Sequence, residues 1–310
     1  MSASTVNRTS TPAVVPQPRR KPPLTWDRAQ RRGFGILRWV VIVGFLLATL
    51  VPFYYMALLS VKPIEALLQD PGSLWVSPSE FTLQTYVDVL SSTEVGGQGF
   101  GTFLANSGMV ALASVALALL IGIPGAYAIA RLPFFGRQQV SGIFLAAYLF
   151  PAILMAIPLF VGFTRIGLRG SLVGLVIVYT AQTVPVAIYM LRNYFETVPE
   201  SVEEAGMVDG LTRLGVLRKI SLPLAMPSIM STGLFVFMIA WNEFLFALLF
   251  LVDRRERWTV SLGLSQLSGS VEVPTTVLMA GSVVLTLPII IIFFATERLL
   301  TGGLTAGAEK

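Results

Sequence analysis

The chain has 310 residues, of which 54% are hydrophobic and only 13% carry charged side chains. A soluble domain of this size has about a quarter charged residues, so much of this protein's surface is expected to face lipid. The sequence has no cysteine and no histidine, which excludes disulfides and removes the commonest metal ligands and general base. The net charge of +5 could indicate nucleic-acid binding, but the basic residues lie at the ends of apolar runs, as in membrane proteins.

The first 35 residues are rich in proline, serine and arginine, as in the stretch STPAVVPQPRRKPPL. This composition cannot bury an apolar core, so residues 1–35 are predicted to form a disordered basic tail. The apolar run that follows is too long for a signal peptide, and no small-residue cleavage site precedes Lys62. It is therefore expected to stay in the protein as a membrane anchor.

Six apolar runs are long enough to cross about 30 Å of hydrocarbon, which takes about 20 helical residues. Because lipid offers the backbone no hydrogen-bond partners, each run is expected to be a helix. The predicted fold is an all-α, polytopic integral membrane protein with one six-helix domain over residues 36–300. The spans are 36–59, 103–130, 140–163, 172–191, 224–251 and 275–295. Kinks are predicted at the prolines within them, which are Pro52, Pro124, Pro151, Pro158, Pro185 and Pro288.

The distribution of basic residues predicts the orientation of these spans. With the N-terminus in the cytoplasm, 16 lysine and arginine residues fall inside and six fall outside, which agrees with the positive-inside rule. An even number of spans then places the C-terminal tail, residues 301–310, in the cytoplasm as well. Outside, residues 78–90 have the spacing of a short amphipathic helix. The outer loop 253–274 is either a simple connector or a contact for an external partner.

The cytoplasmic segment 193–223 has the pattern of two short helices. Ser/Thr-x-x-Glu spacings at Thr197–Glu200 and Ser201–Glu204 predict a capped helix start. Gly210 is expected to end this helix in a left-handed conformation, and Thr212 is expected to cap the next one. Small residues make one side of the first helix narrow. The segment is therefore either a docking element for another protein or a connector on the membrane surface.

Polar side chains in or near the spans are candidates for lining a transport path, namely Asn106, Tyr148, Gln182, Asn242 and Glu243. Glu243 is the only acid inside a predicted span, which makes it a functional hypothesis by default. It follows Pro223 by about 20 residues, or roughly 30 Å of helix, so it is expected near the outer interface. Helix packing and anchoring at the membrane interface are the alternative interpretation, and they explain most such residues.

Two other classes of membrane protein receive little support. A secondary transporter usually shows charged pairs at the midplane or inverted repeats, and a membrane enzyme needs clustered catalytic side chains. Neither pattern is present. The nucleotide-binding pattern G-x-x-x-x-G-K-[ST] is also absent, so any ATP must bind a separate chain.

The segment from residue 204 resembles a known loop of membrane subunits in ABC importers. Glu204-Ala205-Gly206, three residues, Gly210, nine residues, Ile220, one residue and Leu222-Pro223 reproduce its pattern EAA---G---------I-LP. The third position has glycine in place of alanine. Other stretches between residues 36 and 310, such as SVKP (60–63) and AWNEFLFALLFL (240–251), resemble the sugar-importing branch. The chain is similar to the smaller six-span permease of maltose- or trehalose-type systems, which have the type I importer fold.

This resemblance implies a set of partners and a location. A second homologous permease subunit completes the path, two cytoplasmic ATPase subunits hold ATP and magnesium, and an external solute-binding protein delivers the sugar. The chain itself is expected to be no enzyme and to carry no catalytic residue, metal or cofactor. It is expected in a bacterial inner membrane, with both termini cytoplasmic.

The resemblance also implies site residues and a substrate class. Contact with the ATPase is expected from the coupling loop, at Glu203, Glu204, Ala205, Gly206, Asp209, Gly210 and Leu211. A tail that reaches the ATPase is expected at Gly303, Leu304 and Thr305. The expected substrate is a disaccharide or oligosaccharide such as maltose or trehalose, and glycerol phosphate or another sugar or polyol remains open.

Overall fold

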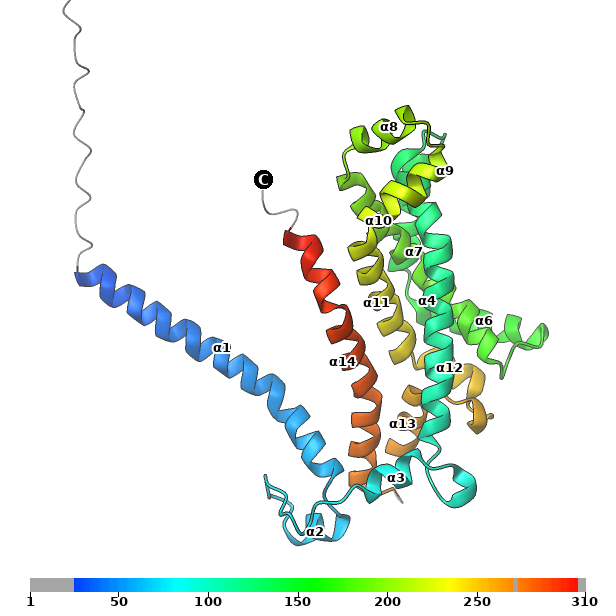
Figure 1. The fold of residues 1–310 in the computed structure, drawn as a ribbon. Helices are drawn as coiled ribbons and strands as arrows, with labels where there is room; N and C mark the ends of the chain where they lie inside the picture. The colour runs from blue at the N-terminus through cyan, green and yellow to red at the C-terminus, as the bar shows by residue number, and fades with distance from the viewer. Residues whose placement is uncertain (1–24, 270–272, 306–310) are drawn as a thin grey trace, which may run out of the picture. The chain divides into compact units, whose positions relative to one another are not determined.

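The computed structural model describes residues 25–269 and 273–305, with side chains for 34–269 and 273–297. Every regular element in these ranges is a helix, which confirms the all-α prediction (Figure 1). The chain forms two units, one up to Phe53 and one from Tyr54 onward.

The first unit consists of most of helix α1, Thr25–Ser60. The helix begins inside the segment predicted as a disordered tail, and residues 1–24 of that tail lie outside the described residues. Large apolar side chains are exposed along it, including Phe34, Trp39 and Phe45. Because exposing such a long apolar surface to water is energetically unfavourable, this helix requires lipid or another protein around it.

The second unit contains the remaining helices (Figure 1). They are α2 (Ile64–Gln69), α3 (Gln84–Leu90), η1 (Thr93–Val95), α4 (Phe100–Arg131), α5 (Arg137–Leu149), α6 (Ala152–Arg165), α7 (Leu172–Thr197), α8 (Glu200–Val208), α9 (Arg213–Val216), η2 (Leu217–Ser221), α10 (Leu222–Leu224), α11 (Met226–Asn242), α12 (Leu245–Leu251), η3 (Arg255–Arg257), α13 (Val260–Ser268) and α14 (Thr275–Thr305). The helix predicted at 78–90 begins only at Gln84, because Ser77 to Phe81 form a turn closed by hydrogen bonds to the Ser77 carbonyl.

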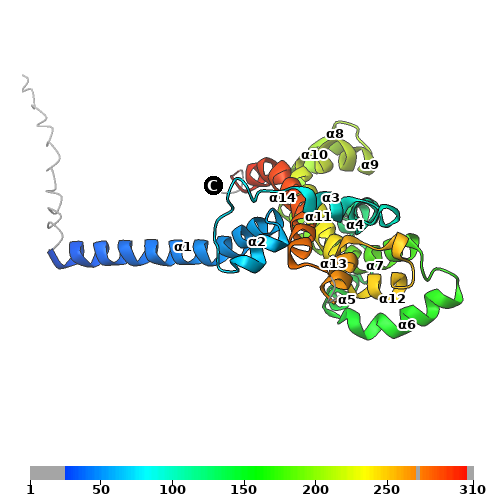
Figure 2. The same cartoon turned by 90° about the horizontal axis from the view of Figure 1, so that it is seen from below.

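Small residues allow α4 and α7 to pack closely. A β-carbon at Gly122 would lie 3.3 Å from the Ala187 β-carbon, and one at Gly125 would lie 3.3 Å from Ile188. Close backbone approach of this kind is typical of membrane helices, which gain van der Waals contact in place of a hydrophobic driving force. Helices α4, α7 and α11 run side by side in the views of Figures 1 and 2, with α8 at one end of this group and α13 toward the other.

Within the described residues, four helices are long and apolar enough to cross a membrane: Phe34–Ser60, Phe100–Arg131, Leu172–Thr197 and Thr275–Glu297. Two bent pairs also qualify, namely α5 with α6 and the segment Arg213–Leu224 with α11. The number of spans is six if each bent pair is one span.

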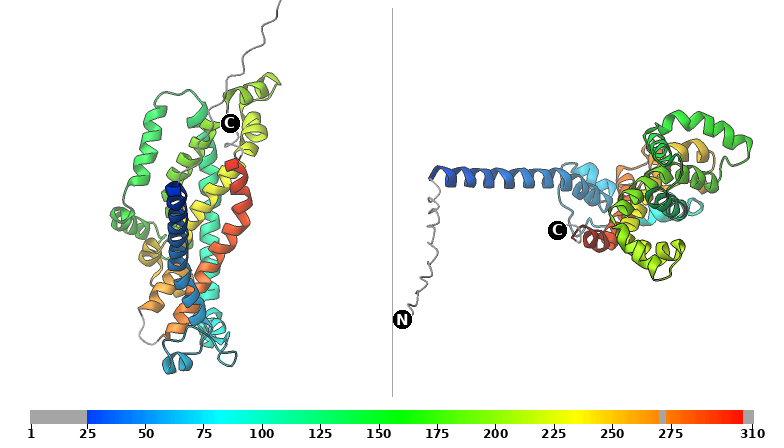
Figure 3. Two further views of the ribbon diagram at one scale, coloured as in Figure 1. Left: turned by 90° about the vertical axis from the view of Figure 1, so that its left-hand side faces the viewer. Right: turned by 90° about the horizontal axis from the view of Figure 1, so that it is seen from above.

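The third and fifth predicted spans are not continuous helices. The range 140–163 is broken at Pro151, where α5 and α6 meet at 89° (Figure 3). Proline at this position has no N–H to continue the α5 ladder. The range 224–251 is broken at Glu243, between α11 and α12. At the other prolines for which a kink was predicted, the helix continues past the ring.

Candidate functional site

Helix α8, Glu200–Val208, lies at one end of the second unit, and α3 and α13 lie toward the other (Figure 1). Pro199 occupies the position before its first turn, and no side chain caps it. The predicted capping box is therefore wrong: the Thr197 hydroxyl instead donates to the Tyr194 carbonyl at 2.7 Å. Acidic Glu200 and Glu203 in the first turn complement the positive end of the helix dipole.

The end of α8 agrees with the prediction. Gly210 adopts φ 88°, and its N–H donates to the Met207 carbonyl at 3.0 Å, while Leu211 donates to Gly206 at 3.0 Å. These bonds satisfy carbonyls that the helix leaves open, as in a glycine-terminated helix end. The Thr212 hydroxyl accepts from the Gly215 N–H at 3.2 Å, so the predicted cap of α9 is confirmed.

Helix α8 has a buried face and an exposed face. Glu203 and Gly206 are buried, and a β-carbon at Gly206 would lie only 2.4 Å from Ile220 Cδ1. Of the other residues predicted to couple to an ATPase, Leu211 is half-buried and four are exposed, namely Glu204, Ala205, Asp209 and Gly210. Val208 is 86% exposed.

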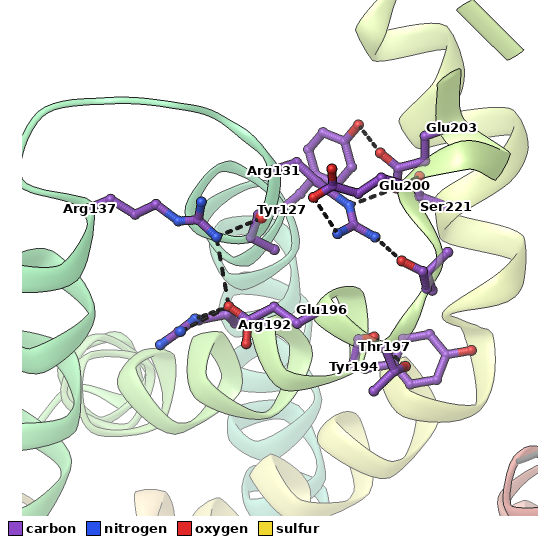
Figure 4. A network of polar contacts seen from close by, with 12 residues as sticks. Tyr127, Arg131, Arg137, Arg192, Tyr194, Glu196, Thr197, Glu200, Glu203 and Ser221 are labelled. Atoms are coloured by element: carbon purple, nitrogen blue, oxygen red, sulfur yellow. Dashed lines mark hydrogen bonds and ion pairs between the residues drawn. The ribbon is translucent and has the colours of Figure 1, made fainter. Parts of the chain in front are cut away.

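The buried carboxylate of Glu203 has three side-chain partners (Figure 4). Its Oε2 accepts from the Tyr127 hydroxyl at 3.1 Å, and its Oε1 accepts from the Ser221 hydroxyl at 2.9 Å. Arg131 Nε lies 3.2 Å from Oε1, and both side chains of this ion pair are only 7% exposed. Buried charges persist only when paired and hydrogen-bonded, and this carboxylate satisfies both conditions.

Arg131 is the last residue of α4, and its guanidinium group contacts both α8 and the end of α7. Its Nη2 donates to the Val198 carbonyl, at the end of α7, at 2.5 Å. Its Nη1 also lies 3.7 Å from Glu200, which is 75% exposed. The Tyr127 ring packs edge-on against Phe195 of α7, with centroids 5.6 Å apart. Helix α8 is therefore fastened to the end of α4, which is in turn bonded to the end of α7.

A second polar network links α5 to α7 (Figure 4). Glu196 accepts from Arg192 Nε at 2.9 Å and lies 3.8 Å from Arg137. Arg137 also donates to the Ala130 carbonyl at 2.8 Å, and Arg192 donates to the Ser141 hydroxyl. These ionic side chains are partly exposed, so each pair contributes little stability.

The residues proposed for a transport path do not gather at one place. Tyr148 and Gln182 line the same cavity of about 530 Å³, between α5, α6, α7 and α11. Asn242 lines another hollow of about 500 Å³, together with Ser261, Ser265, Ser268 and Ser282. Asn106 is buried, and its amide donates to the backbone carbonyls of Glu256 at 3.1 Å and Trp258 at 3.0 Å.

Glu243 stabilises the break between α11 and α12. Its carboxylate accepts from the Tyr179 hydroxyl at 2.5 Å and from the backbone N–H groups of Phe246 at 2.9 Å and Ala247 at 3.3 Å. These bonds cap the start of α12, where open N–H groups favour an anion.

The partners of Glu203 were missed at the level of sequence. Tyr127 and Arg131 are four residues apart and therefore share one helix face, and this spacing could have indicated a common polar partner. At the level of sequence, Arg131 served only to predict the orientation of the spans. Ser221 gave no signal of its own. Gly303, Leu304 and Thr305 belong to α14, and their side chains lie outside the described part of the chain.

The fold, with four to six candidate membrane spans in the described residues, is that of a multi-pass membrane protein. Residues 118–302 match the family described as "Binding-protein-dependent transport system inner membrane component", and the chain belongs to that family. It is thus a multi-pass inner-membrane permease subunit of a binding-protein-dependent ABC importer, which confirms the resemblance described above. Such a subunit is distinct from the ATPase that works with it and carries no cofactor.

Individual relatives are similar in sequence to this protein over most of its length. The inner membrane ABC transporter permease protein YcjP of Escherichia coli strain K12 is 38% identical over 267 residues, which cover 86% of this chain and 93% of YcjP. The trehalose/maltose transport system permease protein MalG of Thermococcus litoralis is 35% identical over 277 residues, which cover 88% and 97%. A crystal structure of a bacterial ABC transporter that imports the acidic polysaccharide alginate matches with TM-score 0.74 at 26% identity, over 87% of this chain and 97% of that chain.

Proposed function

We propose that this permease forms half of a translocation path for a sugar and receives its driving motion from an ATPase that docks on the exposed face of α8. The observation that carries the proposal is the two-sided character of α8. Its inner face is fixed by Glu203 and Gly206, while Glu204, Ala205 and Val208 face outward. An exposed, rigidly held helix face is what a groove on another protein can bind.

A disaccharide or oligosaccharide such as trehalose or maltose is the proposed substrate class. Support comes from the relative named for trehalose and maltose transport and from the alginate importer, both of which handle carbohydrates. The alginate transporter takes an acidic polymer, so a charged sugar is the second candidate.

The two cavities, each lined by apolar side chains with a few polar ones, are the proposed sugar contacts. Tyr148 and Gln182 present a ring and an amide in one, and Asn242 with neighbouring serines presents an amide and hydroxyls in the other. Sugars require both apolar faces and hydrogen-bond partners. Neither Asn106 nor Glu243 lines either cavity, and both form hydrogen bonds within the chain, so we assign them supporting roles outside the path.

The proposed assembly contains a second homologous permease, two ATPase subunits in the cytoplasm and an external solute-binding protein. The excess of basic residues on one side supports cytoplasmic termini and a cytoplasmic α8. We propose that the C-terminal residues Gly303, Leu304 and Thr305 also contact the ATPase.

The test is co-purification of the ATPase with variants of this chain. Val208→Arg and Glu204→Lys change the exposed face of α8 and should reduce recovered ATPase at least tenfold, while the permease pair remains in the membrane. Val95→Arg is the matched control, because Val95 is 76% exposed and belongs to η1, far from α8 along the chain. Full ATPase recovery with both α8 variants would disprove the docking role.

A separate experiment tests the substrate. The cognate external binding protein is titrated with trehalose, maltose and an alginate oligosaccharide, and binding is measured by calorimetry. Binding of none of the three would contradict the proposed substrate class.

A further inference from the structure

Helix α4 has a fastening at each end. At its C-terminal end, Arg131 and Tyr127 hold the buried Glu203 of α8. Near its N-terminal end, Asn106 holds the carbonyls of Glu256 and Trp258, and the Ser107 hydroxyl accepts from the Val260 N–H at 2.8 Å. The two fastened segments are α8 and residues 256–260, which lie toward opposite ends of the second unit (Figure 1).

The fastening at residues 256–260 also includes ring contacts. Phe103 of α4 packs against Trp258 with centroids 5.7 Å apart, and against Phe100 at 5.4 Å. Both phenylalanines are almost fully buried. The contact is tight, because a β-carbon at Gly263 would lie 2.4 Å from the Phe103 ring. Densely packed contacts of this kind transmit displacement with little compression.

The covalent connection from α8 to α11 is less straight than the connection through α4. After α8 the chain turns at Gly210, passes through the π-helical turn η2 and then bends by 75° before α11. Helix α4, in contrast, is a single helix of 32 residues that continues past Pro124 without a break. A continuous helix between two buried fastenings is the stiffer of the two connections.

We propose that α4 is a strut that moves with α8 and carries its displacement to residues 256–260, with Glu203 and Asn106 as the positioning residues at its two ends. Glu203 therefore acts on the inside of the coupling loop, while the adjacent Glu204 belongs to the surface that meets the ATPase. This inference rests on the proposed function for the source of motion, and it identifies the path by which that motion crosses the protein.

This chain has no cysteine, so cysteines introduced for spin labelling are its only labelling sites. Labels are placed at Val202 on α8, off the line of Glu204, Ala205 and Val208, and at Leu120 on α4, both exposed, in the assembled transporter with its second permease and ATPases. The distance distribution between them is measured by electron–electron resonance without nucleotide and with ATP. In the parent, the distribution should be narrow and should not shift with ATP, because α8 and α4 move together.

Glu203→Gln keeps the size of the side chain but removes the charge that pairs with Arg131. In this variant the distribution should broaden and should shift on ATP addition, whereas Glu204→Gln should keep it narrow without nucleotide. Stimulation of ATP hydrolysis by the loaded binding protein should fall at least about fivefold in Glu203→Gln, the lower range of coupling between sites. Asn106→Leu should reduce this stimulation in the same way while its Val202–Leu120 distribution stays narrow, because its defect lies at the other end of α4.

Two results would overturn the strut. One is a parent distribution that shifts with ATP, and the other is a Glu203→Gln variant that keeps the parent's distribution and stimulation. If Glu203→Gln does not assemble, Tyr127→Phe removes only one hydroxyl from the same fastening and should broaden the distribution to a smaller extent; an unchanged distribution there would count against the proposal. Failure of the docking role itself would appear separately, as full ATPase recovery with Val208→Arg.

Discussion

Glu203 and Arg131 form an ion pair at 3.2 Å in which each side chain is 7% exposed, although the next residue, Glu204, faces outward. The pair joins α8 to the last residue of α4. A buried ion pair adds little net stability compared with an apolar pair of the same shape, but it becomes costly when one member is lost. The pair therefore determines the position of α8 more than it stabilises the bundle.

Replacing Glu203 alone should strongly destabilise the protein. Glu203→Leu leaves the Arg131 guanidinium buried without its carboxylate, at a cost of about 3–5 kcal/mol. Glu204→Leu, at an exposed position, should change the stability by less than about 0.5 kcal/mol. Thermal unfolding of the purified permease pair in detergent compares the two variants, and equal unfolding midpoints would show that Glu203 is not the buried partner of Arg131.

The double variant should recover much of this loss. In Glu203→Leu with Arg131→Met, neither charge remains, and the apolar side chains can pack where the ion pair was. Buried ion pairs replaced in this way are often neutral or more stable by about 1–4 kcal/mol. The same unfolding experiment should place the double variant above Glu203→Leu alone. A double variant less stable than the single one would mean that Arg131 has a second essential contact, such as its bond to the Val198 carbonyl.

The local features of α8 were predictable, and its orientation was not. Gly210 and Thr212 act within three residues of themselves, so their roles follow from residue type and spacing. The direction of Glu203 depends on Tyr127, 76 positions away along the chain. Adjacent glutamates at 203 and 204 have the same local propensities, and only the packing of α8 on α4 and η2 determines which one is buried.

Gly206 should tolerate alanine only after an adjustment at Ile220. A β-carbon there would lie 2.4 Å from Ile220 Cδ1, and overpacking of this kind costs about 1–3 kcal/mol. Alanine gains about 1 kcal/mol over glycine in a helix, so Gly206→Ala should be mildly destabilising overall. Adding Ile220→Val removes the obstructing methyl group and should restore the unfolding midpoint. A midpoint that falls further in the double variant would show that the clash involves another group.

The breaks in the third and fifth spans differ in how far the sequence could predict them. The first break lies at Pro151, one of six prolines at which a kink was predicted. The sequence therefore did not indicate which proline would produce a sharp bend and which would lie in a continuous helix. The second break has no proline, and the apolar run continues through it. Glu243 supplies the acceptors that the start of α12 needs, and that role depends on Tyr179 of α7 holding the carboxylate in place.

Glu243 should therefore matter for stability more than its hydroxyl partner. Glu243→Ala leaves the N–H groups of Phe246 and Ala247 without an acceptor and should cost about 2 kcal/mol or more, since each unsatisfied buried group costs about 1–3 kcal/mol. Tyr179→Phe removes one hydrogen bond and should cost about 1 kcal/mol. Asn242→Ala is the neighbouring control, because Asn242 is exposed. If Asn242→Ala shifts the unfolding midpoint as much as Glu243→Ala, the capping role of Glu243 is wrong.

Substitutions at Gly210 test whether the end of α8 depends on the left-handed backbone conformation alone. A β-carbon at Gly210 would meet nothing within 4 Å, yet φ is +88°, so Gly210→Ala should cost about 1–2 kcal/mol from left-handed strain alone. Gly108 in α4 also has open space around a β-carbon but an ordinary helical φ, and Gly108→Ala should instead stabilise by up to about 1 kcal/mol. Gly210→Pro, whose ring fixes φ near −65°, should displace α8 and release the ATPase. Opposite shifts of the unfolding midpoint for the two alanine variants are the expected result; stabilisation by Gly210→Ala would show that this turn has no left-handed requirement.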